Sequence, residues 1–363
     1  MSELTRDSVE AALRAWTEPH LGQDLVSAKA VKDIRVDGGK VAIRIELGFP
    51  AAGFHERLRA AVARAVNAAS PAAQVQVDIA TVIASHAVQG GLRPLQGIKN
   101  IIAVASGKGG VGKSTVAANL ALALAAEGAK VGVLDADIYG PSQPRMLGVA
   151  GKPESKDGKT LEPMQNYGLQ VMSIGFLIDE EQPMVWRGPM VTQALTQLLN
   201  ETRWHDLDYL VVDLPPGTGD IQLTLAQKVP VTGAVIVTTP QDIALLDARK
   251  GLKMFEKVNV PVLGIVENMS THVCSNCGHE EHIFGAGGGG RMAEQYKVDL
   301  LGSLPLDIRI REQADTGKPT VVAAPESTLA ESYREIARKA AARIALKSKD
   351  FSARFPKIVV QDS

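Results

Sequence analysis

Apolar residues near the start of the chain recur with helical spacing in two stretches and with a period of two in the others. The period-two pattern runs through "VKDIRVDGGKVAIRIEL", where Asp37, Gly38 and Gly39 interrupt it and predict a hairpin turn. Together these patterns predict a small α+β domain over residues 1–83. Its helices are expected at residues 6–16 and 54–69, its hairpin at residues 31–47 and a third strand at residues 75–83.

Residues 84–98 lose this periodicity and carry glycine and proline, so we expect a linker there. Beyond it, over residues 99–346, short runs of Val, Ile and Leu alternate with helical stretches. Strands that are apolar at almost every position are buried on both faces, as in a parallel sheet. We therefore expect an α/β fold with a doubly wound, mostly parallel sheet, in which ligands bind at the carboxyl ends of the strands. Its strands are predicted at residues 101–106, 130–137, 209–215, 234–240 and 262–269.

The end of the chain predicts one more helix and a tail. Ser327 or Thr328 is placed to cap a helix over residues 329–346, and the tail over residues 347–363 is expected to be loose. The first residues include acids and no long apolar stretch, and no segment reaches the ~18 apolar residues of a membrane span. We expect a cytoplasmic protein without stable membrane association.

The charge balance of 39 basic against 40 acidic residues argues against a broad nucleic-acid surface, which needs a strong positive field. Cys274 and Cys277 are the only two cysteines, and they form a C-x-x-C. In the cytoplasm thiols stay reduced, so this spacing favours metal or redox chemistry over a structural disulfide.

The strongest motif is "GKGGVGKS", which matches G-x-x-x-x-G-K-[ST] between a predicted buried strand and a helix. Glycines let the backbone wrap around phosphate oxygens, and the start of the helix adds its positive dipole end. Lys113 is expected to reach the β- and γ-phosphates and Ser114 to bind Mg²⁺. A second lysine, Lys108, is not required by an ordinary phosphate loop.

Polar residues follow three later strands. Asp135 and Asp137 lie two apart on one strand, so they share a face and can hold Mg²⁺ or orient water. Asp213 ends an apolar strand, where a carboxylate is costly unless it serves the metal, and Gly217 and Gly219 follow it. Asn268 follows the last strand and is either a base-reading amide or a turn residue.

The motif "GKGGVGKS" resembles the deviant Walker A motif of the P-loop NTPase family that contains ParA, MinD and the nitrogenase iron protein. The resemblance implies a homodimer in which Lys108 crosses to the partner's phosphates, Asp137 activates the attacking water and Asn268 reads adenine. Lys108, Lys113 and Asp137 are then the catalytic residues, and Ser114, Asp135 and Asp213 the Mg²⁺ residues. The implied ATP site consists of Gly107, Lys108, Gly109, Gly110, Val111, Gly112, Lys113, Ser114, Thr115 and Asn268.

A closer resemblance, to the Mrp/ApbC family, covers residues from about 95 to 345. It rests on "SGKGGVGKSTVAANLA", "DADIYGPS", "WRGPM", "DLPPGTGD" and the C-x-x-C. It implies an ATPase that carries a [4Fe–4S] cluster to apo iron–sulfur proteins, with cluster-assembly factors as further partners. The N-terminal domain resembles an iron–sulfur-assembly domain, although it contains no cysteine. Arg187 in "WRGPM" has no role that physical reasoning assigns.

Four thiolates hold a [4Fe–4S] cluster, so the resemblance implies that two chains each contribute Cys274 and Cys277. One alternative is a P-loop regulatory ATPase with a structural zinc, since Cys274, Cys277, His279 and His282 form C-x-x-C-x-H-x-x-H. A dithiol redox pair, or a C-x-x-C that only shapes the dimer, also remains open.

Overall fold

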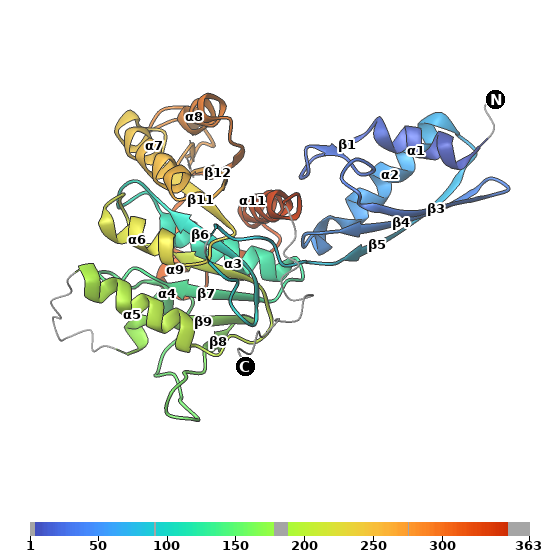
Figure 1. Cartoon of the computed structure of the whole chain (residues 1–363). Coiled ribbons are helices and arrows are strands. Elements are labelled where there is room, and N and C mark those ends of the chain that lie inside the picture. The colour runs from blue at the N-terminus through green and yellow to red at the C-terminus, as the bar shows by residue number, and fades with distance from the viewer. Residues whose placement is uncertain (1–3, 91, 178–187, 275, 348–363) are drawn as a thin grey trace, which may run out of the picture.

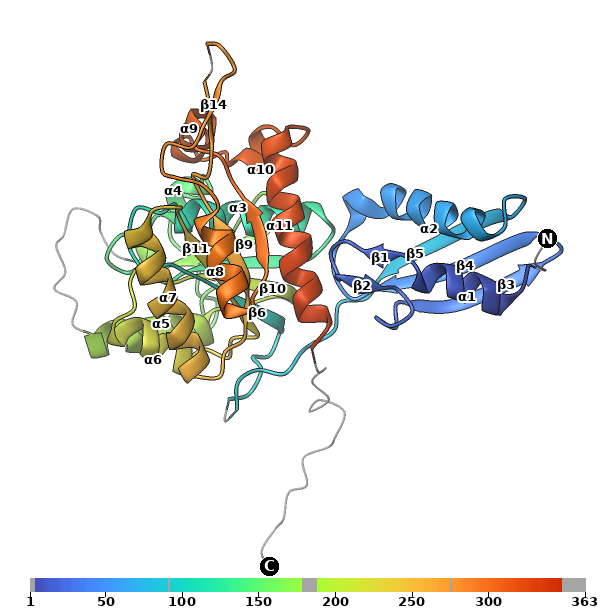
Figure 2. The same cartoon turned by 90° about the horizontal axis from the view of Figure 1, so that it is seen from above.

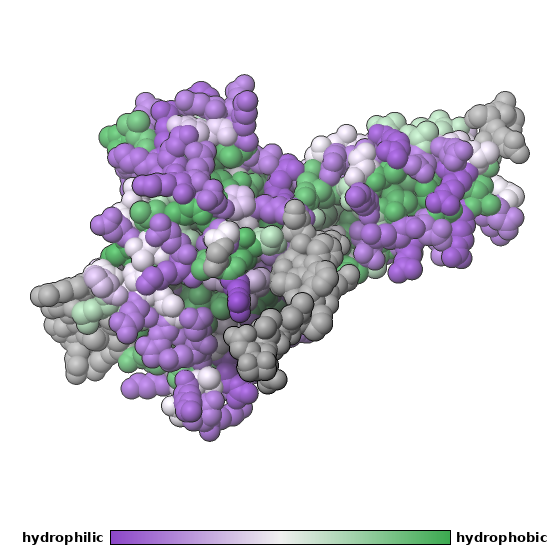
Figure 3. Space-filling model, in the orientation of Figure 1, coloured by the Kyte–Doolittle hydropathy of each residue, from purple (hydrophilic) through white to green (hydrophobic). Residues whose placement is uncertain are grey.

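The structure, a computed structural model, describes residues 4–90, 92–177, 188–274 and 276–347. It consists of a small N-terminal unit and a larger unit, joined side by side (Figure 1). In the space-filling view the smaller unit is a narrow extension of the larger one (Figure 3). Among the described residues, no helix combines the length and the apolar character needed to cross a membrane.

The smaller unit packs two helices on a three-stranded sheet of order β3-β4-β5. β3 and β4 are antiparallel, whereas β4 and β5 are parallel. Val41, Ile43 and Ile45 are buried and alternate with exposed residues along β4, which is the period-two pattern of the sequence. The elements are α1 (Arg6–Arg14), β1 (Thr17–Glu18), β2 (Gln23–Asp24), β3 (Val31–Asp37), β4 (Lys40–Leu47), α2 (His55–Ala69) and β5 (Gln74–Thr81).

The larger unit is built on an eight-stranded sheet of order β15-β12-β11-β6-β10-β7-β9-β8. Only β8 is antiparallel to its neighbour. The strands are β6 (Ile98–Ala105), β7 (Val131–Asp135), β8 (Met164–Asn166), β9 (Leu169–Ser173), β10 (Leu207–Asp213), β11 (Gly233–Thr238), β12 (Val262–Glu267) and β15 (Leu300–Ser303). The predicted doubly wound α/β fold is confirmed, and β8, β9 and β15 are strands that the pattern did not predict.

Helices cover both faces of this sheet (Figure 1). α3 and α11 pack against each other on one face, and contacts connect α5 to α6, α6 to α7 and α7 to α8 on the other. The helices are α3 (Lys113–Ala126), α4 (Gln143–Met146), α5 (Gly188–Glu201), α6 (Asp220–Lys228), α7 (Asp242–Lys257), α8 (Gly288–Tyr296), α9 (Ile308–Asp315), α10 (Thr320–Ala323) and α11 (Thr328–Ala345). Ser327 caps α11 by accepting a hydrogen bond from the backbone N–H of Ala330, 3.1 Å away.

The smaller unit docks on α11 and on the C-terminal end of α3 through buried charges. The Arg338 guanidinium is fully buried and pairs with the carboxylate of Glu127, the residue that caps α3. Arg338 Nη1 also donates to Glu331 and Glu335 on its own helix, at 2.9 Å each. Glu127 accepts a hydrogen bond of 2.8 Å from the backbone N–H of Gly53 in the smaller unit. One ion-pair cluster therefore connects the two units.

His20 extends this cluster into the smaller unit. Its Nδ1 lies 2.8 Å from a Glu18 oxygen and its Nε2 lies 2.9 Å from a Glu335 oxygen. Burial alone would lower the pKa of His20, but the two carboxylates outweigh it and raise this pKa above the ordinary 6.5. The stabilisation from protonated His20 is therefore complete below about pH 6.5 and is lost as the pH rises through the raised pKa.

We expect Arg338→Ala to lower the free energy of unfolding by about 3–5 kcal/mol, because it removes the cation in direct contact with the buried carboxylate of Glu127 and leaves Arg334 Nε 3.9 Å away. Calorimetric unfolding of the full chain measures this loss. The matched control is the double variant Arg338→Met with Glu127→Gln, which removes both charges and keeps an acceptor for Gly53. A double variant that is as unstable as Arg338→Ala would show that the ion pair is not the source of the effect.

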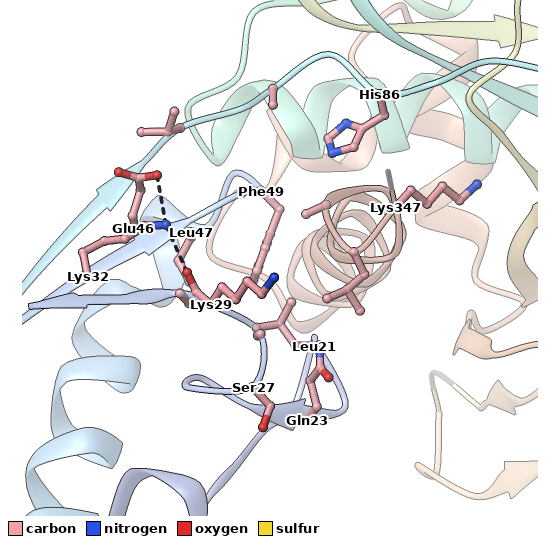
Figure 4. A pocket seen from close by; sticks show the side chains of 17 residues that line it. Leu21, Gln23, Ser27, Lys29, Lys32, Glu46, Leu47, Phe49, His86 and Lys347 are labelled. Atoms are coloured by element: carbon pink, nitrogen blue, oxygen red, sulfur yellow. Dashed lines mark hydrogen bonds and ion pairs between the residues drawn. The ribbon is translucent and has the colours of Figure 1, made fainter. Parts of the chain in front are cut away.

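Beside this cluster the two units leave a cavity of about 430 Å³ (Figure 4). Leu21 and Phe49 of the smaller unit line it together with His86 of the connecting segment and Lys347 after α11. Lys347 Nζ donates a hydrogen bond of 2.9 Å to the carbonyl of Thr232, and burial lowers the pKa of this amine to about 8. The first residue of the expected loose tail is therefore held in place, and residues 348–363 lie outside the described residues.

Candidate functional site

The phosphate loop joins the end of β6 to the start of α3. Gly112 has φ +80°, and a Cβ there would lie 2.2 Å from Asn268 Nδ2. A Cβ on Gly107 would lie 2.1 Å from the backbone carbonyl carbon of Asp247 in α7. Only glycine fits at these two positions, so the glycines of the motif are required by the packing of the loop as well as by access to phosphate.

Lys113 occupies the first position of α3 and is 6% exposed. Its Nζ forms an ion pair with the carboxylate of Asp213 and donates a hydrogen bond of 3.1 Å to Ser114 Oγ. The lysine expected to reach the phosphates therefore lies beside two of the three residues expected to hold Mg²⁺, Ser114 and Asp213. The charge of the Lys113 ammonium neutralises the carboxylate of Asp213.

Sheet register brings the predicted carboxylates together. Asp213 at the end of β10 is paired with Asp135 at the end of β7, and both are fully buried. Burial raises the pKa of Asp135 to about 7, and the neighbouring Asp213 charge adds to the rise. Two buried carboxylates that both carry charge need a cation between them, which suits Mg²⁺ and its preference for oxygen ligands.

Asp137 lies two residues beyond β7 and is half-buried. Burial is the main cause that raises its pKa; Lys113 opposes the rise and Asp213 adds to it. A carboxylate whose pKa is moved toward neutral is better suited to accept a proton from water at physiological pH. The geometry is therefore compatible with the role that the family resemblance implies for Asp137.

The remaining predicted nucleotide residues surround the loop. Lys108 is half-buried, and its backbone carbonyl accepts a hydrogen bond of 2.9 Å from Ser106 Oγ. Gly217 N donates 3.0 Å to the carbonyl of Ser106, which connects the segment after β10 to the loop. Asn268 Nδ2 donates a hydrogen bond of 2.9 Å to the carbonyl of Val111, so its amide supports the loop. Gly109 and Gly110 are exposed, Val111 is buried, and Gly112, Ser114 and Thr115 are half-buried.

Cys274 and Cys277 lie on a hairpin that projects from the body of the larger unit (Figure 2). Its strands are β13 (His272–Val273) and β14 (Glu280–Glu281), and its turn is closed by a 2.8 Å hydrogen bond from Gly278 N to the Cys274 carbonyl. Cys274 is half-buried and Cys277 is exposed. Hydrogen bonds from the Cys277 backbone, and next from that of Asn276, lower the pKa of the Cys274 thiol. A lowered pKa favours the thiolate, the form that binds metal.

The two histidines of the zinc alternative have other neighbours. His282 Nδ1 lies 2.9 Å from the carbonyl of Ser270, and His279 Nε2 lies 3.8 Å from a carboxylate oxygen of Glu281. Within residues 4–90, 92–177, 188–274 and 276–347, no group of three or more His, Cys, Asp or Glu is gathered as a metal site. Single-chain zinc is therefore not favoured.

The sequence motifs assigned no role to Ser142, the last residue of "DADIYGPS", or to Gln143, which begins α4. The backbone N–H groups of both residues donate to Asp135 Oδ2, at 3.0 Å each. A helix of four residues is too short to show apolar periodicity, so the sequence pattern does not predict α4. Only the amide of Gln143, directly after "DADIYGPS", could have suggested a polar role.

Comparison with known proteins identifies the family of the chain. Residues 97–341, more than half of the chain, match the family model described as "NUBPL iron-transfer P-loop NTPase", and residues 6–79 match "Iron-sulfur cluster assembly protein". The iron-sulfur cluster carrier protein of Escherichia coli strain K12 is 52% identical over 347 residues, which cover 94% of this chain and 93% of that protein. The mouse iron-sulfur cluster transfer protein NUBPL is 53% identical over 254 residues, which cover 69% of this chain and 80% of that protein.

Solved structures show the same fold. A nucleotide-binding protein from Archaeoglobus fulgidus, in complex with ADP, is 42% identical with a TM-score of 0.56, over 64% of this chain and 90% of that chain. The cell division ATPase MinD of Pyrococcus furiosus is 25% identical with a TM-score of 0.51, over 66% of this chain and 97% of that chain. Arg187, which the sequence left without a role, lies outside the described residues. The chain belongs to the family of NUBPL-type iron-transfer P-loop NTPases, the Mrp/ApbC group of iron–sulfur cluster carriers.

Proposed function

We propose that the chain binds and hydrolyses ATP with Mg²⁺ and carries a [4Fe–4S] cluster held between the two subunits of a homodimer. The cluster is cargo, which the dimer transfers to apo iron–sulfur proteins and receives from cluster-assembly factors in the cytoplasm. The observation that carries the proposal is an exposed hairpin that presents the only two thiols of a P-loop NTPase. Two thiolates are half of the set that such a cluster needs.

The nucleotide part rests on the grouping at the carboxyl ends of β6, β7 and β10. Ser114, Asp135 and Asp213 supply oxygen ligands that fit Mg²⁺, and buried oxygens of Ser142 and Gln143 have no hydrogen-bond partner among the described residues. Bound Mg²⁺ would neutralise charge on the phosphates. The ADP complex of the Archaeoglobus fulgidus relative supports nucleotide binding by this fold.

In the proposed mechanism the residues of the chain act through position and charge. Lys113 leaves Asp213 and binds the β- and γ-phosphates, and the loop N–H groups hold the phosphate oxygens. Asp137 orients water and accepts its proton as the water attacks the γ-phosphorus, while the bond from the γ-phosphorus to the bridging oxygen breaks and ADP leaves with that oxygen. Lys108 reaches the phosphates in the partner subunit, so hydrolysis depends on the dimer.

The test is anaerobic reconstitution with iron and sulfide, followed by metal analysis and measurement of mass in solution. We expect about two irons per chain, in a dimer with broad visible absorption, because four irons are shared by two chains. About one tightly held zinc per chain in a monomer, with no iron that can be reconstituted, would instead support the structural-zinc alternative. Nucleotide binding in the same sample separates the two halves of the proposal.

A further inference from the structure

Gln143 contacts three elements of the nucleotide site at once. It is fully buried at the start of α4. Its Nε2 donates hydrogen bonds of 2.9 Å to the carbonyl of Ser114 and to Asp213 Oδ2. Its backbone N–H donates to Asp135 Oδ2 at 3.0 Å. One residue therefore joins the start of α3 to the ends of β7 and β10.

The oxygen of this amide has no hydrogen-bond partner among the described residues. Gln143 Oε1 is buried and accepts no hydrogen bond from the described residues, and the same holds for Ser142 Oγ. The orientation of the Gln143 amide is fixed, because the Ser114 carbonyl and Asp213 Oδ2 are both acceptors and therefore require the NH₂ group on their side. A buried acceptor left unsatisfied costs about 1–3 kcal/mol, so a donor is expected to fill this position in the working protein. Mg²⁺ in proteins keeps several of its waters, and each of them is a hydrogen-bond donor.

The hydrogen bonds of Asp213 also indicate that Gln143 holds part of the proposed metal site in place. Among the described residues, Lys113 Nζ donates to one carboxylate oxygen of Asp213 and Gln143 Nε2 donates to the other. When Lys113 moves to the phosphates, as the phosphate loop implies, Gln143 is the donor that stays with Asp213. The amide is therefore placed to keep this carboxylate aimed at Ser114 while the lysine changes partner.

We propose that Gln143 is a positioning residue of the Mg²⁺–nucleotide site. Its Nε2 fixes Asp213 beside Ser114, and its Oε1 accepts a hydrogen bond from a Mg²⁺-bound water. The inference rests on the proposed nucleotide function and names an outer-shell partner of the metal, a class of residue whose loss costs about 10- to 100-fold in metal affinity.

The variant Gln143→Met keeps the length and burial of the side chain and removes both amide functions. The probe is ADP, titrated calorimetrically into the full chain once with Mg²⁺ and once in EDTA. We expect the ratio of the two ADP affinities to fall by about 10- to 100-fold relative to the parent, with the affinity in EDTA nearly unchanged. Mn²⁺ bound with ADP, followed by electron paramagnetic resonance, should weaken in parallel.

Gln89→Met is the matched control. Gln89 is also buried, its Nε2 donates 2.7 Å to the carbonyls of Ala226 and Val229, and its Oε1 lacks a partner among the described residues. It contacts none of the proposed metal residues, so its loss should leave the affinity ratio at the parent value. If Gln143→Met does not fold, Gln143→Asn is measured by the same ratio.

An unchanged ratio in a folded Gln143 variant, or an equal loss with Mg²⁺ and in EDTA, would overturn the inference and leave Gln143 a packing residue. Failure of the parent itself to bind ADP would instead overturn the proposed nucleotide function. The two failures are therefore distinguishable in one set of titrations.

Discussion

Replacing Cys274 or Cys277 with serine is expected to abolish stable binding of the iron–sulfur cluster. The chain has no other thiol, so each substitution leaves two thiolates in the dimer where four are needed. The hydroxyl of serine is a poor substitute, because soft thiolates are the ligands that select iron–sulfur clusters. After anaerobic reconstitution, visible absorption and iron content should both fall to background.

The matched controls are His279→Ala and His282→Ala, which alter the same hairpin without removing a thiol. Both should keep the parent iron content, since neither imidazole belongs to a cluster of three or more His, Cys, Asp or Glu in the part of the chain that the structure describes. Loss of metal in the histidine variants, together with zinc in the parent, would favour the single-chain zinc alternative. A serine variant that keeps about two irons per chain would contradict the shared cluster.

Asp137→Asn is expected to lower ATP hydrolysis by about 10²- to 10⁴-fold while ATP still binds, because the amide has the size of the carboxylate but cannot accept the proton of the attacking water. Phosphate release measures the first effect and calorimetric ATP titration the second. Asp206→Asn is a matched control: Asp206 is exposed and paired with Lys130, and asparagine tolerates its positive φ. Hydrolysis at the parent rate in Asp137→Asn would assign the catalytic carboxylate elsewhere.

The residues of the proposed nucleotide site could be predicted from the sequence because short-range rules place them. A glycine-rich loop between a strand and a helix, and carboxylates directly after buried strands, have few other physical explanations. The parallel register then brings Asp135 and Asp213 side by side without further information. Strands such as β8 and β15 were missed because three or four residues at a sheet edge are too few to show a period.

Contacts between distant parts of the chain could not be predicted in the same way. The sequence pattern of α11 allows Arg338 to be exposed. In the structure its side chain is buried where it pairs with Glu127 at the end of α3 and where the smaller unit docks. Asn268 was expected at a base, and its hydrogen bond to Val111 follows from the approach of two loops that are far apart in the sequence. Gln143 was missed because nothing local distinguishes a buried amide from an exposed one.

The anchoring of the smaller unit on Glu127 gives α3 the properties of a lever. The helix spans 14 residues, so it measures about 21 Å from the phosphate loop to the anchor. A tilt of about 6° about the phosphate end would move the anchor by about 2 Å. That displacement exceeds the tolerance of the hydrogen bond from Gly53 to Glu127, which is 2.8 Å long. If nucleotide binding tilted α3 by this small angle, the hydrogen bond from Gly53 to Glu127 would break and the contact between α3 and the N-terminal unit would weaken.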